Sequence, residues 1–171
     1  MNPLSKKVCL LGDFAVGKTS LARRFLYHAF DDQYVSTIGV KVSRKSVAVD
    51  TDAGVVELAM MVWDLAGSEA FDQMRASYLR GASGAILVCD LTRPATFASL
   101  RAYAEDVRRI SPDARFVLAA NKLDLVRPHQ IDEEQLRRFA NSLPAAYFLV
   151  SAKTGEAVEL LFRELGRSLV S

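Results

Sequence analysis

The stretch Gly12-Asp13-Phe14-Ala15-Val16-Gly17-Lys18-Thr19 decides the fold of this chain. It fits the pattern G-x-x-x-x-G-K-[ST], in which two glycines let the backbone curl until successive N–H groups point inward at phosphates. Lys7 to Leu11, before it, indicates a buried strand, and Ser20 to Tyr27, after it, indicates a helix. This order of strand, loop and helix predicts a phosphate-binding site at a helix N-terminus.

The residue types in this loop predict a nucleotide held with a metal ion. Lys18 would supply a cation to the β and γ phosphates, and the hydroxyl of Thr19 can ligate Mg²⁺. We therefore expect every residue from Gly12 to Ser20 to contribute to nucleotide binding.

Two later stretches, Asp64-Leu65-Ala66-Gly67 and Asn121-Lys122-Leu123-Asp124, complete the predicted site. Asp64 ends an otherwise apolar strand, where a carboxylate is costly to bury without a cation. The carboxylate of Asp124 can accept two hydrogen bonds from the N1–H and exocyclic amine of guanine, and adenine offers no such pair. Ser151-Ala152-Lys153 ends another strand, where a backbone N–H could donate to the guanine carbonyl. These stretches predict binding of a guanine nucleotide with Mg²⁺.

Alternating strand and helix patterns predict an α/β fold with a six-stranded, mostly parallel sheet that carries helices on both faces. The expected strands are Lys7 to Leu11, Val40 to Val49, Val55 to Asp64, Ala85 to Asp90, Phe116 to Asn121 and Tyr147 to Val150. The expected helices are Lys18 to His28, Phe71 to Leu79, Pro94 to Ile110, Asp132 to Ser142 and Glu156 to Leu169. The turn formers of Asp50 to Gly54 predict one antiparallel hairpin. In such a sheet, ligands bind beyond the carboxyl ends of the strands, where the motifs converge.

The composition narrows the possible partners and compartments. With 171 residues, 50% of them hydrophobic, the chain can bury one core, so we expect a single domain over residues 1–171 and a monomer. The net charge of +2 and the scattered basic pairs do not favour nucleic-acid binding. Cys9 and Cys89 lie in predicted buried strands without metal-ligand spacing, which favours a reducing compartment. No stretch has the length and apolarity of a membrane span, and we expect a cytoplasmic protein.

Taken together, these residues resemble the Ras superfamily of small GTPases, and within it the Rab branch. The resemblance covers practically the whole chain and implies that the α/β fold is a P-loop NTPase G domain. Besides the stretches above, it rests on Ser36-Thr37-Ile38-Gly39-Val40, Val62-Trp63-Asp64-Leu65-Ala66-Gly67-Ser68-Glu69 and Ser77-Tyr78-Leu79-Arg80-Gly81-Ala82.

The resemblance implies roles for residues of the second motif and of the segment that precedes it. Thr37 would close over Mg²⁺ and the γ-phosphate, Asp64 would hold Mg²⁺ through a water, and Gly67 would offer its N–H to the γ-phosphate. Phe30 would pack edge-on against the guanine, and Tyr34 would lie over the phosphates. The metal set is thus Thr19, Thr37 and Asp64.

Around the base, the resemblance implies that Asn121 tethers the base loop and that Lys122 packs along the base and reaches the first motif. Ala152, between Ser151 and Lys153, would present the N–H to the guanine carbonyl. Some assignments have an alternative. Phe30 and Trp63 could fill the core, and Thr37 could stand at a strand edge.

The resemblance implies four catalytic residues, Lys18, Thr37, Gly67 and Ser68. Two positions, 14 and 68, depart from the family in ways that bear on catalysis. Ser68 stands where the family usually has the glutamine that orients the attacking water, and it is too short to reach the same place. Phe14 stands where most relatives carry a small residue, and its ring would crowd the entry point of an arginine finger. We expect slow GTP hydrolysis. The alternative is a GTP-loaded scaffold without useful catalysis, and a P-loop kinase is disfavoured because Asp124 argues against ATP.

The partner surface also departs from the family pattern. Effectors, activators and exchange proteins are expected to bind through Thr37, Val42, Trp63 and Tyr78, with Val42 replacing a phenylalanine. Arg167 to Ser171 contain no cysteine for prenylation, so we expect membrane association only through other recruitment or through a tail beyond these residues.

Overall fold

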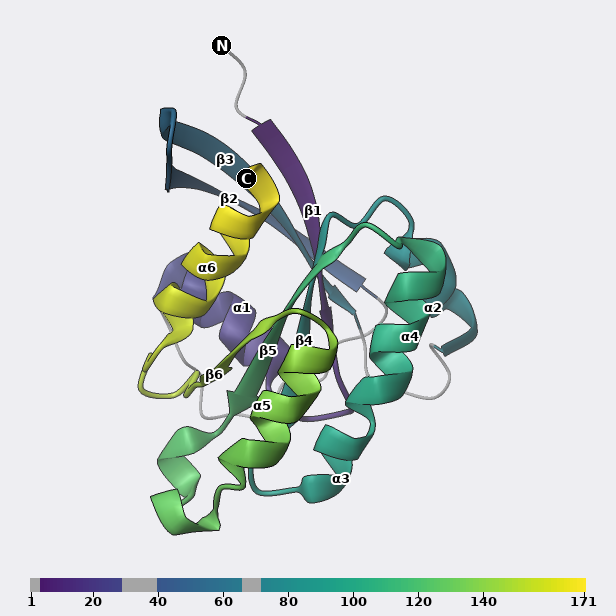
Figure 1. Ribbon diagram of the computed structural model, residues 1–171, viewed down its shortest axis with the longest axis vertical. Coiled ribbons are helices and arrows are strands. Elements are labelled where there is room, and N and C mark those ends of the chain that lie inside the picture. The colour runs from purple at the N-terminus through teal and green to yellow at the C-terminus, as the bar shows by residue number, and fades with distance from the viewer. Residues whose placement is uncertain (1–3, 29–39, 66–71) are drawn as a thin grey trace.

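The computed structural model describes residues 4–28, 40–65 and 72–171 (Figure 1). The strands are β1 (Leu4–Leu11), β2 (Val40–Thr51), β3 (Gly54–Leu65), β4 (Gly84–Asp90), β5 (Arg115–Asn121) and β6 (Ala146–Leu149). The helices are α1 (Lys18–Tyr27), α2 (Asp72–Leu79), α3 (Pro94–Ala98), α4 (Leu100–Ile110), α5 (Glu133–Ser142) and α6 (Val158–Val170), with short 3₁₀ helices at Leu123–Leu125 and Pro128–Gln130.

The six strands form one sheet in the order β2-β3-β1-β4-β5-β6. Only β2 and β3 pair antiparallel, through a two-residue turn between Thr51 and Gly54, and the other neighbours are parallel. The predicted sheet and hairpin are therefore confirmed. The strand order reverses at β1, which lies between β3 and β4, and ligands of open α/β sheets bind at such a reversal. The residue after β1 is Gly12.

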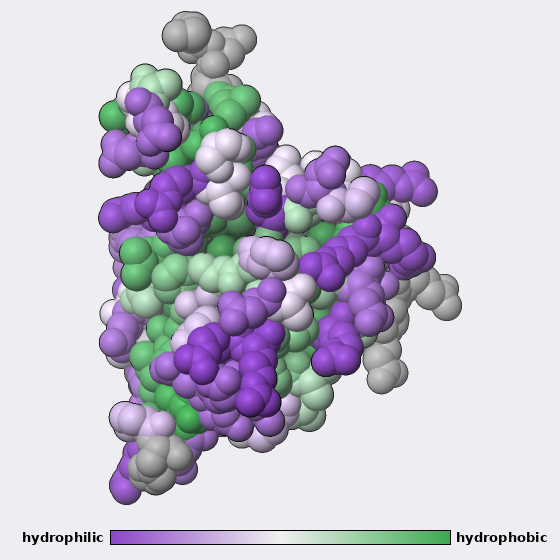
Figure 2. All heavy atoms as spheres, viewed as in Figure 1, coloured by the Kyte–Doolittle hydropathy of each residue, from purple (hydrophilic) through white to green (hydrophobic). Residues whose placement is uncertain are grey.

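Helices cover both faces of the sheet, as predicted (Figure 1). One hydrophobic cluster joins α1 and α6 to one face, and a second joins α2, α4 and α5 to the other. Every residue of β4 is buried, as expected for a central parallel strand covered on both sides. Hydrophilic residues gather over α5, in the lower centre of Figure 2, because this helix buries only Leu136 and Ala140.

The predicted helix from Pro94 to Ile110 is wrong in one respect, because it is divided at Ser99 into α3 and α4. The hydroxyl of Ser99 donates its one hydrogen to the carboxylate of Asp13 at 2.6 Å, and its oxygen also lies 3.1 Å from the carbonyl oxygen of Ala95. The helix is thus divided at the residue whose side chain bonds to the phosphate-binding loop.

The other helices differ from prediction only at their ends. The last helix begins at Val158 rather than Glu156, because Gly155 (φ 87°) and Ala157 (φ 60°) adopt left-handed backbone conformations that a helix cannot include. Asp132 precedes α5 as its N-cap and accepts a hydrogen bond from the backbone N–H of Gln135. His28 ends α1 in a left-handed conformation.

Candidate functional site

The glycine-rich loop runs from the end of β1 to the first turn of α1, and its glycines are required by close contacts. A Cβ on Gly17, whose φ is +102°, would lie 2.3 Å from the amide nitrogen of Asn121. A Cβ on Gly12 would lie 2.3 Å from the carbonyl oxygen of Val88. The loop therefore packs directly against β4 and the end of β5, and larger residues cannot replace these two glycines without displacing backbone or a buried amide.

Lys18 lies inside this loop and is only 6% exposed. Its ammonium donates to the backbone carbonyls of Gly12 at 2.8 Å and Asp13 at 3.1 Å. Burial lowers the pKa of Lys18 to about 8, and Asp64 and Asp13 only partly oppose this effect while Arg93 adds to it. The loop thus holds a cation that is short of negative charge, which a phosphate group would supply.

Thr19 and Asp64 bring two oxygen donors together beside Lys18. The hydroxyl of Thr19, in the first turn of α1, donates to Oδ2 of Asp64 at 2.5 Å, and Asp64 is 3% exposed near the end of β3. A hydroxyl next to a buried carboxylate suits Mg²⁺, which prefers oxygen ligands and usually keeps waters and phosphate oxygens in its remaining positions. The described residues therefore fit the predicted metal ion.

Asn121 joins the phosphate-binding loop to the predicted base loop. Its side-chain amide donates to the carbonyl of Val16 at 2.9 Å, and its Oδ1 accepts from the backbone N–H of Ala152 at 3.2 Å. Asn121 is 2% exposed, and both bonds tie distant parts of the chain. Asn121 thus links the phosphate-binding loop to the loop that carries Ala152, and its role as a tether of the base site stays a prediction.

Asp124 and Ser151 face each other at the predicted base site. The hydroxyl of Ser151 donates to Oδ1 of Asp124 at 2.7 Å and accepts from the backbone N–H of Thr154 at 3.1 Å. Ser151 is fully buried, whereas Asp124 lies on the exposed side of its 3₁₀ helix. This arrangement fixes one carboxylate oxygen of Asp124 and leaves the side chain accessible to a ligand.

The side chain of Asp13 turns away from the inside of the loop. Its carboxylate accepts from the hydroxyls of Ser99 at 2.6 Å and Tyr103 at 2.9 Å, which anchors the loop to α4. Only the backbone of Asp13 is thus placed to contact a nucleotide. The side chain of Phe14, the next residue, is 50% exposed.

Sequence reasoning missed Arg24, Asp90 and Arg93. Arg24 donates from Nε to the carbonyl of Ala152 at 2.8 Å, and also donates to that of Lys153. Oδ2 of Asp90 accepts hydrogen bonds from the ammonium of Lys122 and from Nε of Arg93, both at 2.9 Å. A signal for Asp90 was present, because it ends an apolar strand just as Asp64 does. The contacts of the two arginines depend on tertiary structure.

Several predicted residues lie outside the described part of the chain, namely Phe30, Tyr34, Thr37, Gly67 and Ser68. Of the predicted partner surface, the remaining three residues lie together. Val42 pairs with Trp63 across β2 and β3, and the rings of Trp63 and Tyr78 are 6.2 Å apart. Val42 is 44% exposed, whereas Trp63 is partly buried and carries the ammonium of Lys7 at 3.8 Å from its ring centroid. Trp63 thus both packs on the core and contributes to this surface.

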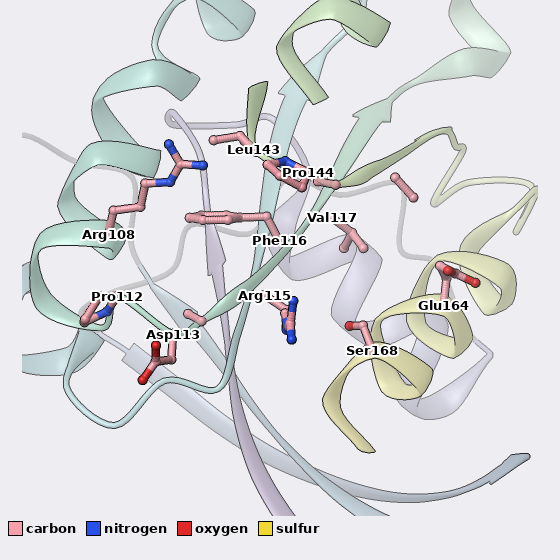
Figure 3. Close-up of a pocket in the computed structure, with 13 residues that line it drawn as sticks. Arg108, Pro112, Asp113, Arg115, Phe116, Val117, Leu143, Pro144, Glu164 and Ser168 are labelled. Carbon is pink, nitrogen blue, oxygen red and sulfur yellow. The ribbon is translucent and has the colours of Figure 1, made fainter. Parts of the chain in front are cut away.

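A separate cavity of about 570 Å³ lies among the residues that precede β5 and β6, at the other end of these strands from the glycine-rich loop (Figure 3). Its lining combines Arg108 and Arg115 with Asp113 and Glu164. Arg108 lies over the ring of Phe116, with its guanidinium carbon 5.8 Å from the ring centroid, and donates to the carbonyl of Ser142. Among the described residues, none of those predicted for the nucleotide site lines this cavity.

The fold and the loop geometry define a P-loop nucleotide-binding domain. Residues 7–171 match the Ras family, and the chain belongs to this family of small GTPases. It is 35% identical over 166 residues to Ras-related protein Rab-22A of the dog, covering 96% of this chain and 84% of that protein. It is 34% identical over 175 residues to Ras-related protein RabJ of Dictyostelium discoideum, covering 99% of this chain and 67% of that protein. These relatives place the chain in the Rab branch. In the described part of the chain, no helix could span a membrane.

Proposed function

We propose that this protein is a molecular switch that binds GTP and GDP with Mg²⁺. The observation that carries the proposal is that Lys18, Asp64 and Asp124 lie at or just beyond the carboxyl ends of β1, β3 and β5. Membership of the Ras family supports GTP binding as the general function. We further infer a single domain over residues 1–171, because one continuous sheet and one family match extend through nearly all of it.

Asp124 would select guanine by accepting from the N1–H and the exocyclic amine of the base. The hydroxyl of Ser151 holds one oxygen of that carboxylate, which restricts its orientation before any ligand arrives. A site built around such a pair of acceptors leaves them unpaired with adenine, and this can discriminate by roughly four orders of magnitude. Arg24 donates to the carbonyl of Ala152, and Asn121 accepts from its N–H. With nucleotide bound, this N–H would donate to the guanine carbonyl instead of to Asn121.

Thr19, Thr37 and Asp64 would hold Mg²⁺, with Asp64 acting through a water. When bound, this ion would neutralise the charge that develops on the phosphates. The short bond between Thr19 and Asp64 supports the proposal, because it brings together a hydroxyl and a carboxylate of the predicted set. Thr37 and Gly67 would contact the γ-phosphate, so that hydrolysis would release both and change the surface offered to effectors.

We infer that GTP hydrolysis by this chain is slow because Ser68 cannot orient the attacking water as a glutamine does. The expected deficit is about tenfold to a hundredfold, equivalent to about 1.4–2.8 kcal/mol of transition-state stabilisation. Single-turnover hydrolysis by the purified protein and by Ser68→Gln tests this inference. The glutamine variant should be faster by that factor, and equal rates would contradict the proposed role.

The exposed ring of Phe14 would also weaken activation by an arginine finger. Half of this residue is accessible at the loop, and its carbonyl is bonded to Arg93, so its backbone is held in place. Phe14→Gly should therefore respond more strongly to an activator protein that supplies an arginine. An unchanged response would argue against crowding by the ring.

A second candidate function is a GTP-loaded scaffold that binds effectors through Val42, Trp63 and Tyr78 without useful hydrolysis. Phe14 and Ser68 favour it, whereas Thr19 and Asp64 favour a complete magnesium site. The decisive experiment is to identify the nucleotide that co-purifies with the protein and to follow its conversion over time. Conversion to GDP supports the switch, and GTP that persists supports the scaffold. If the stripped, folded protein did not prefer guanosine over adenosine phosphates in calorimetry, both would be refuted.

A further inference from the structure

Three successive carbonyl groups of the phosphate-binding loop are each bonded by a side chain from another part of the chain. Nη2 of Arg93 donates to the carbonyl of Phe14 at 2.9 Å, and the ammonium of Lys122 donates to that of Ala15 at 3.0 Å. The amide of Asn121 donates to the carbonyl of Val16 at 2.9 Å. The loop is therefore held from one side at three consecutive peptide groups.

These bonds determine where the loop's N–H groups point. The peptide bonds of the described chain are trans, so each carbonyl points away from the N–H of the residue that follows it. Holding the carbonyls of residues 14–16 outward thus turns the N–H groups of Ala15, Val16 and Gly17 to the opposite side of the loop. That of Val16 makes only a long contact, 3.4 Å, with the carbonyl of Asp13. Convergent N–H groups of this kind form a cradle for phosphate.

Asp90 connects two of the three donors. Its side chain is 1% exposed, and its Oδ2 accepts from both Nε of Arg93 and Nζ of Lys122 at 2.9 Å. Its Oδ1 accepts from the backbone N–H of Thr92 at 2.8 Å and from the hydroxyl of Thr92 at 2.6 Å. Burial would raise the pKa of Asp90, but the hydrogen bonds from Thr92, Lys122 and Arg93 outweigh it and lower the pKa to about 2. Asp90 is therefore an anion at neutral pH.

We propose that Asp90 and Arg93 are positioning residues of the phosphate-binding loop, with Asp90 fixing the two cations that hold the carbonyls of Phe14 and Ala15. The inference rests on the proposed function, in which this loop binds the phosphates of the nucleotide. Without Asp90, Arg93 and Lys122 would repel each other and Lys18, and neither would be oriented toward the loop. Without Arg93, Asp90 would keep Lys122 as its cation, and of the three carbonyls that of Phe14 alone would lose its partner. The N–H of Ala15 would then lose its orientation.

The test compares the affinities of the full chain for GDP and GMP, measured by displacement of a fluorescent GDP analogue in excess Mg²⁺. Arg93→Ala should weaken GDP binding about tenfold, because part of the binding free energy would then be needed to order the loop. GMP binding should change much less, because GMP lacks the β-phosphate that this part of the loop would hold. The ratio of the two affinities should fall by nearly the same factor as the affinity for GDP.

Arg101→Ala is the matched control, because Arg101 is an exposed arginine on α4 and, within the described residues, no contact joins it to the loop. It should leave both affinities unchanged. Asp90→Asn should lower the GDP to GMP ratio further than Arg93→Ala, since it releases both cations. Should that variant not fold, as circular dichroism would reveal, Arg93→Ala still decides, because the Arg93 side chain is 43% exposed and its loss leaves no large cavity.

The outcomes separate the inference from the proposed function. If wild-type protein binds GDP but Arg93→Ala changes neither affinity, or lowers both by the same factor, Arg93 does not position the phosphate cradle and the inference is wrong. A wild-type protein that binds neither GDP nor GMP would instead overturn the proposed function, and the inference with it.

Discussion

Lys18→Met should stabilise the nucleotide-free protein while abolishing nucleotide binding. Burial lowers the pKa of Lys18 from its ordinary value of 10.5 to about 8, so the folded state holds the charged amine less favourably than the unfolded state does. A difference of about 2.5 pKa units corresponds to about 3 kcal/mol at 1.36 kcal/mol per unit. Methionine has a similar length and carries no charge. The bonds that Lys18 donates to Gly12 and Asp13 are lost, so we expect a net gain of about 1–3 kcal/mol at pH 7.

The pH dependence of the free energy of unfolding distinguishes removal of the buried Lys18 charge from better packing of the methionine side chain. Below pH 8, Lys18 is protonated in both states and the full penalty is present. Between pH 8 and 10.5, the unfolded state binds more protons than the folded state, so wild-type stability rises with pH relative to the variant. The advantage of Lys18→Met should therefore shrink by about 2 kcal/mol between pH 7 and pH 9.5. Above the unfolded-state pKa the variant should be less stable than wild type, because the charge penalty is gone and the lost hydrogen bonds remain.

Urea unfolding of the stripped protein at both pH values measures this advantage, and Lys41→Met serves as the control because Lys41 is exposed on β2. The control should show little change at either pH. An advantage of Lys18→Met that is equal at pH 7 and 9.5, or a variant that is less stable than wild type at pH 7, would refute the argument. With phosphate bound, wild type should become more stable than Lys18→Met, because the phosphate interacts favourably with the ammonium that the variant lacks.

Three further substitutions test other parts of the site. Asp124→Asn should lower GDP affinity at least about a hundredfold and favour xanthosine diphosphate in calorimetry, because the new amide donates to a carbonyl where guanine has an amine. Gly17→Ala should destabilise the protein by about 2–4 kcal/mol in urea unfolding, since its Cβ would displace the amide of Asn121. Gly54→Ala is the control: Gly54 also has a positive φ, +114°, but no atom lies within 4 Å of the added Cβ, so the cost should be only about 1–2 kcal/mol. Thr19→Ala should make GDP release nearly equally fast with Mg²⁺ and with EDTA; a large remaining difference would contradict its role as a metal ligand.

The order of strands and helices could be predicted from the sequence because each apolar run is bounded by turn residues or by a charged residue such as Asp64. The division of the helix at Ser99 could not, because it depends on a hydrogen bond to Asp13, which lies 86 residues earlier. The same limit applies to Arg24 and Arg93. An arginine in a helix or loop has no local sequence feature that identifies which carbonyl it will reach.

The two halves of the proposed site are mechanically connected through Asn121. Its amide group bonds the phosphate-binding loop at Val16 and, at Ala152, the loop that follows β6, and it is nearly completely buried. The adjacent Lys122 repeats the connection, from the start of the base loop to Ala15 and Asp90. A displacement of either loop must therefore stretch or break hydrogen bonds that are shielded from water, which is costly. It follows that a partner that distorts the base loop would also loosen the phosphate cradle, so nucleotide release need not begin at the phosphates.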